Sequence, residues 1–109
     1  MSISTHVLDT MRGQPAAGLG ASLHRREPDG DWKEVGQGET DADGRIRRLA
    51  DEELEAGEYR LELETRPYFE RSGLSAFYPV VQVVFTFEGG HLHVPVLLSA
   101  YGYTTYRGT

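Results

Sequence analysis

The stretch Tyr59-Arg60-Leu61-Glu62-Leu63-Glu64 alternates apolar and charged residues without a break. Successive side chains of a β-strand point to opposite faces, so this pattern predicts a strand with one buried and one hydrated face. Alternation or a short apolar run recurs along the rest of the chain. The segments that we predict to be strands are residues 3–8, 19–23, 32–35, 45–49, 59–64, 81–87, 92–98 and 101–107.

Turn-forming residues separate these segments, because Gly, Pro and Asp tolerate tight or left-handed backbone. Residues 67–73 form the only helix that the pattern predicts, with Pro67 in its first turn and Gly73 just past its end. Many short strands with frequent turns predict an all-β fold. We expect an antiparallel β-sandwich of about eight strands in two sheets. The predicted turns lie at Gly13-Gln14-Pro15, Pro28-Asp29-Gly30, Asp41-Ala42-Asp43-Gly44, Ala56-Gly57 and Gly89-Gly90.

Length and composition limit the classes of function. The chain has 109 residues, and we predict one domain over residues 1–109. So small a body leaves little room for an enclosed cavity, so a site is expected in a surface cleft or between subunits. The net charge of −6 gives no general electrostatic footprint for nucleic acid. The absence of cysteine excludes disulfides, thiolate nucleophiles and Cys-based zinc sites.

The sequence shows no targeting signal. Residues 1–5 lack the basic and apolar regions of a leader, and no run approaches transmembrane length. We therefore predict a cytoplasmic protein without a membrane partner.

The histidines are the first candidates for chemistry, because imidazole titrates near neutral pH and can take a proton from water. Of the four, His91 and His93 fall on one face of a predicted strand, with apolar Leu92 and Val94 on the other. His6 also lies on a strand, opposite Thr5 and Val7. His91 and His93 could instead be two metal ligands, or one surface and one hydrogen-bonded histidine. Two ligands are too few, so we predict no metal.

Arginines gather in Gly44-Arg45-Ile46-Arg47-Arg48-Leu49. On a strand, Arg45 and Arg47 project to one face and Arg48 to the other. A guanidinium on a rigid strand suits contacts to carbonyl oxygens or an enolate-like anion, although solvated surface charge is the simpler interpretation. The preceding Asp41-Ala42-Asp43-Gly44 lacks the terminal acidic ligand of a calcium loop and reads as a turn.

The last nine residues are unusual for a chain end, which tends to be polar and frayed. They read Tyr101-Gly102-Tyr103-Thr104-Thr105-Tyr106-Arg107-Gly108-Thr109 and contain three tyrosines in a strand pattern. Tyrosine is favoured at interfaces, because its ring is buried while its hydroxyl finds a partner. This segment is either a last strand packed on a neighbouring subunit or, in addition, the lining of a shared pocket.

Three motifs together resemble those of the 5-hydroxyisourate hydrolases, the enzyme branch of the transthyretin family. They are Ser4-Thr5-His6-Val7-Leu8-Asp9, then Thr40-Asp41-Ala42-Asp43-Gly44-Arg45-Ile46, and His91-Leu92-His93-Val94-Pro95-Val96-Leu97-Leu98-Ser99 running into Tyr101–Thr109. The long C-terminal motif is the most specific of the three. Thr109 is a departure, since Ser is usual there; Leu92, where Tyr is common, is expected to point into the core.

The resemblance implies a fold, an assembly and a reaction. The fold is a transthyretin-type sandwich of two four-stranded sheets, assembled as a homotetramer with active sites at the dimer–dimer interface. The reaction is metal-independent hydrolysis of a cyclic amide of 5-hydroxyisourate to 2-oxo-4-hydroxy-4-carboxy-5-ureidoimidazoline during urate degradation, without a cofactor. The resemblance implies catalytic roles for His6, Arg45, His93 and Thr109, and substrate binding by His6, Arg45, Tyr106 and Arg107.

We hypothesise that one of His6 and His93 takes the proton from water while the other orients the substrate. Arg45 would stabilise the oxyanion. Two alternatives remain open: a transthyretin-like carrier of a small aromatic ligand without catalysis, and a structural sandwich module. Transthyretin itself lacks the N-terminal histidine and the terminal Tyr-Arg-Gly-Ser, which favours the enzyme.

Overall fold

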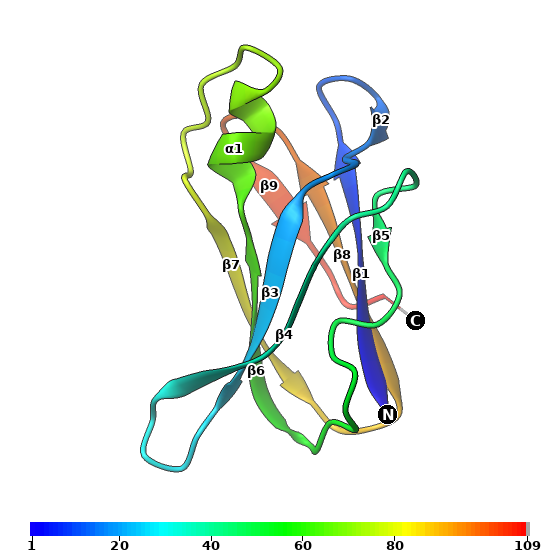
Figure 1. The fold of residues 1–109 in the computed structure, drawn as a ribbon, viewed down its shortest axis with the longest axis vertical. Helices are drawn as coiled ribbons and strands as arrows, with labels where there is room; N and C mark the ends of the chain where they lie inside the picture. The colour runs from blue at the N-terminus through cyan, green and yellow to red at the C-terminus, as the bar shows by residue number, and fades with distance from the viewer. Residues whose placement is uncertain (109) are drawn as a thin grey trace.

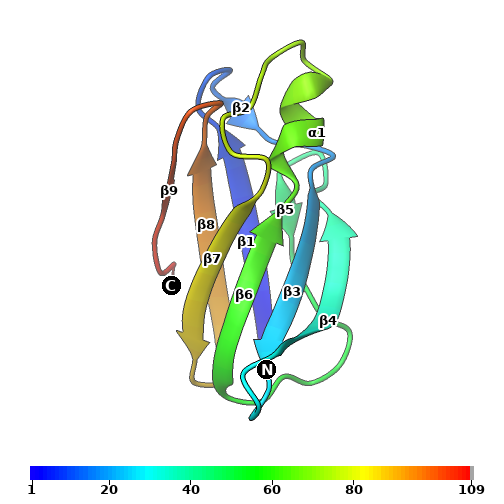
Figure 2. The same ribbon diagram turned by 90° about the vertical axis from the view of Figure 1, so that its left-hand side faces the viewer.

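The computed structural model describes residues 1–108, which form two facing β-sheets and one short helix (Figures 1 and 2). The first sheet has the order β2-β1-β8-β9, and β5 also pairs with β1. Its strands are β1 (Ser2–Asp9), β2 (Gln14–Pro15), β5 (Arg45–Ile46), β8 (His91–Leu98) and β9 (Tyr103–Thr105). The second sheet has the order β4-β3-β6-β7. Its strands are β3 (Gly20–Arg26), β4 (Trp32–Glu39), β6 (Gly57–Leu63) and β7 (Val81–Phe87).

The core lies between the two sheets and is built from the alternating apolar positions. Tyr59, Leu61 and Leu63 of β6 are all 0% exposed, so the alternation of this strand is confirmed. In β8, Leu92 and Val94 are buried while His91 is exposed, which confirms the two faces predicted for that strand. The predicted β-sandwich is confirmed.

Three details depart from the predictions. β1 and β8 pair in parallel, with Ser4 beside His93, whereas we expected antiparallel strands. This pairing joins strands from the two ends of the chain, so no hairpin forces it to be antiparallel. The first sheet also contains β2, which occupies part of the turn that we predicted at residues 13–15, and β5 ends at Ile46 where we predicted a strand to residue 49. Similarly, β9 covers only Tyr103–Thr105 of the predicted 101–107.

Helix α1 (Thr65–Glu70) covers one end of the sandwich (Figure 2). It begins two residues before the predicted start, so Pro67 still lies in its first turn, where a missing N–H costs nothing. The Tyr68 hydroxyl donates to the buried carboxylate of Asp9 at 2.7 Å and ties the helix to the end of β1. The pKa of Tyr68 is raised to about 12, mainly by burial and secondly by this hydrogen bond to Asp9. Among residues 1–108, no helix is long and apolar enough to cross a membrane.

Candidate functional site

The parallel register of β1 and β8 brings serines and histidines together on the outer face of the first sheet. Ser2 pairs with His91, and Ser4 pairs with His93. Because residues two apart on a strand share a face, the four side chains form one row away from the core. A shift of the register by one residue would turn the serines away from this row.

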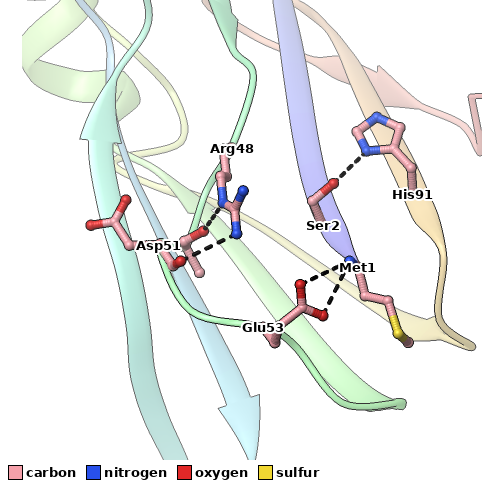
Figure 3. A network of polar contacts seen from close by, with 7 residues as sticks. Met1, Ser2, Arg48, Asp51, Glu53 and His91 are labelled. Atoms are coloured by element: carbon pink, nitrogen blue, oxygen red, sulfur yellow. Dashed lines mark hydrogen bonds and ion pairs between the residues drawn. The ribbon is translucent and has the colours of Figure 1, made fainter.

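Hydrogen bonds connect the row from end to end. Ser2 Oγ lies 2.7 Å from His91 Nδ1, and Figure 3 marks this hydrogen bond with a dashed line. Ser4 Oγ lies 3.2 Å from His91 Nε2 and 2.9 Å from His93 Nδ1. Ser4 is only 6% exposed, so a buried hydroxyl bridges the two imidazoles.

The Asp41–Gly44 turn positions Arg45. The Asp41 carboxylate accepts hydrogen bonds from the backbone N–H groups of Asp43 (2.9 Å) and Arg45 (3.0 Å). The hydrogen bond from the Arg45 N–H is the largest cause that lowers the pKa of Asp41, and the bond from the Asp43 N–H lowers it further. Gly44 has a φ of 76°, and its carbonyl accepts a hydrogen bond from the Val7 N–H at 2.8 Å, which docks the turn on β1. β5 then pairs with β1 so that Arg45 lies opposite His6.

His6 is held by the same turn. Its Nε2 lies 2.8 Å from the backbone carbonyl of Asp43. A carbonyl only accepts, so His6 Nε2 carries the proton and donates. The His6 and His93 rings are neighbours, with their centroids 6.5 Å apart and their planes tilted by 34°.

Ser4, Arg45 and His93 are among the residues that line an open polar cleft of about 330 Å³. A second cleft, of about 520 Å³, is lined by His6 and Asp43 and shares Arg45 and Arg47 with the first. Two guanidiniums on one wall favour a planar ligand with carbonyl oxygens or negative charge. The residues that line the first cleft are Ser4, Thr5, Arg45, Arg47, His91 and His93.

The electrostatics of the cleft favour neutral imidazole at His93. Burial is the main cause that lowers the pKa of His93, and His6, Arg45 and His91 add to it. The neutral form therefore predominates near pH 7, since the ordinary value is about 6.5. A neutral imidazole beside two guanidiniums can accept a proton from water while the arginines hold an oxyanion.

The C-terminal segment runs back along β8. The Gly108 N–H donates to the His93 carbonyl at 2.9 Å, and a Cβ at residue 108 would lie 2.7 Å from Cδ2 of the His93 ring. Tyr106 and Arg107, however, line a different, mostly apolar cleft of about 320 Å³ beside Val83 and Phe85 of β7.

The structure thus brings together His6, Arg45 and His93, as predicted, but not Tyr106 and Arg107 of the same chain. Thr109 lies outside the described residues. Sequence reasoning did not assign Ser4, His91 or Arg47 to the site. Arg47 could have been found, because it alternates with Arg45 and therefore lies on the same strand face. Ser4 could not, because its place beside His93 depends on the register of β1 and β8.

The chain matches the model of the HIUase/Transthyretin family over residues 3–108. It belongs to this family. Among curated family members, the 5-hydroxyisourate hydrolase of Mus musculus is 44% identical over 98% of this chain and 94% of its own length. The 5-hydroxyisourate hydrolase of Caulobacter vibrioides is also 44% identical, over 98% of this chain and 97% of its own length.

Solved structures of the family have the same fold. The Klebsiella pneumoniae 5-hydroxyisourate hydrolase aligns with a TM-score of 0.89 and 36% identity, covering all of both chains. A sea bream transthyretin in complex with thyroxine aligns with a TM-score of 0.93 and 31% identity, covering 99% of this chain and 95% of that one. The fold is therefore shared by an enzyme and by a transthyretin.

Proposed function

We propose that this protein is a 5-hydroxyisourate hydrolase, which opens a cyclic amide of 5-hydroxyisourate with water. The observation that carries the proposal is the convergence of His6, Arg45 and His93 on one polar face. Relatives named as known or probable 5-hydroxyisourate hydrolases are 37–44% identical over nearly the whole chain. The product is 2-oxo-4-hydroxy-4-carboxy-5-ureidoimidazoline, which places the activity in urate degradation.

We assign the general base to His93. Its lowered pKa keeps the imidazole neutral, and no hydrogen bond between described residues engages its Nε2. His6 instead donates through Nε2 to the Asp43 carbonyl, which suits it to orient the substrate or water. Arg45 stabilises the negative charge that develops on the carbonyl oxygen as water attacks.

We also propose a homotetramer with its active sites at the dimer–dimer interface. Tyr106 and Arg107 line a different cleft from the histidines of their own chain, so we propose that they bind substrate in the site of a neighbouring subunit. The proposed catalytic role of Thr109 and the predicted cytoplasmic location stay predictions. The proposed reaction uses neither a metal nor an organic cofactor.

The test is the ultraviolet decay of 5-hydroxyisourate, generated from urate by urate oxidase, with and without this protein. We expect faster decay with the wild-type chain, and a loss of about a hundredfold or more in His93→Ala and Arg45→Ala. His24→Ala is the matched control, because His24 lies on the second sheet beside Ser22. Decay at the spontaneous rate with folded wild-type protein would reject the proposal.

The likeness to sea bream transthyretin favours a second candidate, a carrier of a small aromatic ligand. A carrier would bind such a ligand saturably without forming product. The polar lining of the histidine cleft favours the enzyme, because a purely apolar ligand would leave His93 and Arg45 without partners.

A further inference from the structure

Ser4 lies in the site, but the proposed reaction assigns no role to its hydroxyl. Its hydroxyl is buried between two imidazoles, 2.9 Å from His93 Nδ1 and 3.2 Å from His91 Nε2. A hydroxyl carries one proton, so it can donate to only one of the two rings. The direction of that bond decides which nitrogen of His93 carries hydrogen.

Two directions exist, and they differ in what His93 presents to the cleft. If Ser4 donates to His91 Nε2, then His93 Nδ1–H donates to Ser4, and the lone pair of His93 is on Nε2. If Ser4 donates to His93 Nδ1, then Nε2 carries the hydrogen and cannot accept a proton. Only the first direction leaves His93 able to act as a base through Nε2.

The charges around the cleft favour the first direction. Arg45 and Arg47 line the same cleft as His93, and the pKa of His93 is lowered first by burial and then by His6, Arg45 and His91. A lone pair directed toward positive charge is more stable than an N–H directed toward it. His91 completes the pattern, because its Nδ1–H can then donate to Ser2 Oγ at 2.7 Å (Figure 3).

We propose that Ser4, backed by His91, is a positioning residue that holds His93 as the Nδ1–H tautomer with its Nε2 lone pair toward the substrate. The inference rests on the proposed hydrolase function. When His93 takes the proton of the attacking water at Nε2, its Nδ1–H becomes a stronger donor to Ser4. The Ser4 hydroxyl, already directed at His91, can strengthen its bond in turn and stabilise the imidazolium.

Kinetics of three variants test the role in turnover. Ser4→Ala should lower kcat by about tenfold or more and leave KM within about twofold, since the hydroxyl acts on His93 and not on the substrate. Ser4→Thr retains the hydroxyl and should recover most of kcat. The matched control is Ser22→Ala, which breaks a Ser–His bond of 3.0 Å to His24 on the second sheet and should leave kcat unchanged.

Nitrogen NMR of histidine-labelled protein without substrate reads the tautomer directly. We expect a protonated Nδ1 and an unprotonated Nε2 at His93 in the wild type, and a mixture of tautomers in Ser4→Ala. A wild-type His93 protonated on Nε2 would overturn the proposal, as would a Ser4→Ala variant with wild-type kcat. A loss of kcat that Ser4→Thr does not recover, with an unchanged tautomer, would assign Ser4 a structural role instead. If the wild type does not speed decay, the hydrolase proposal fails by itself, and the spectrum still decides the tautomer.

Discussion

At the scale of single residues, the site depends on a few contacts made by His93. The ring is bonded to Ser4 through Nδ1, neighbours the His6 ring, and is backed by Gly108. Each contact limits the ring to one position, which a base needs in order to meet the attacking water. The chemistry is therefore sensitive to small changes around this one imidazole.

The first prediction concerns the pH dependence of kcat/KM. The base must be deprotonated, and the pKa of His93 is lowered from the ordinary value of 6.5. Activity should therefore be fully developed near pH 7 and fall as the pH decreases, with the midpoint of the acid limb below 6.5. The measurement is kcat/KM from about pH 5 to about pH 8, corrected for spontaneous decay. A midpoint above 6.5 would contradict the assignment of His93 as base.

The second prediction uses the close approach of Gly108. A Cβ at residue 108 would lie 2.7 Å from His93 Cδ2 and 3.0 Å from the His93 carbonyl, so Gly108→Ala should displace the ring. We expect kcat to fall by about tenfold or more while the melting temperature changes little. Gly102→Ala is the control, since its nearest contact would be 3.8 Å away, at Ser99 Oγ. Equal activity in the two variants would show that the position of His93 tolerates the methyl group.

At the scale of elements, the turn between β4 and β5 delivers Arg45 to the site. The short strand β5 pairs with the middle of β1, and the Asp41 carboxylate closes the turn through two backbone N–H groups. The resulting pairing of Arg45 with His6 is thus set by a four-residue turn and not by the arginine itself. A substitution that moves the turn should therefore displace both Arg45 and His6.

The third prediction is that Gly44→Ala damages both stability and activity. Gly44 has a φ of 76°, and a Cβ there would lie 2.4 Å from the Val7 carbonyl oxygen. We expect unfolding by urea to show a loss of about 1–3 kcal/mol, together with reduced turnover because Arg45 moves. Gly30→Ala is the control, because Gly30 has a φ of 94° but a Cβ there would meet nothing within 4 Å. Should both variants lose the same stability and remain fully active, the docking of the turn would not matter.

At the scale of the whole molecule, each sheet ends in a strand that carries exposed apolar side chains. β7 ends the second sheet and β9 ends the first, and Figure 2 shows both on the same side of the sandwich. Val84 of β7 is 57% exposed, Tyr103 of β9 is 40% exposed, and Tyr106, which directly follows β9, is 58% exposed. Open edges with apolar side chains favour association, which agrees with the proposed assembly.

The fourth prediction tests whether one site takes residues from two chains. His93→Ala and Arg107→Ala proteins should each be nearly inactive if both residues serve the reaction. The two variants are then refolded together in equal amounts. If Arg107 acts in the cleft of a neighbouring subunit, about one quarter of the sites should be active, because half of the chains supply an intact His93 and half supply an intact Arg107. Native mass spectrometry would confirm that the mixed assemblies are tetramers. No recovery in mixed tetramers would mean that His93 and Arg107 serve a site within one chain.

The sequence by itself predicted the longer strands and their buried faces, and it pointed to His6, Arg45 and His93 as candidate site residues. Period-two alternation depends only on local backbone geometry, so Tyr59, Leu61 and Leu63 could be assigned to the core without knowledge of the fold. His6, Arg45 and His93 were identified through motifs, and the structure places them together. The start of helix α1 was missed by two residues, because no side chain caps it and its contacts are tertiary.

Only the tertiary structure decided which side chains meet across strands. The parallel pairing of β1 with β8 places Ser4 between His91 and His93, although these residues are nearly ninety positions apart in sequence. The pairing of β9 with β8 leads into Tyr106 and Arg107, which line a different cleft from that of His91 and His93. Alternation fixes the face on which a side chain lies but carries no information about the neighbouring strand or its register. Those depend on how the whole core packs, because a one-residue slip of β1 would bury its polar face and expose Ile3 and Val7.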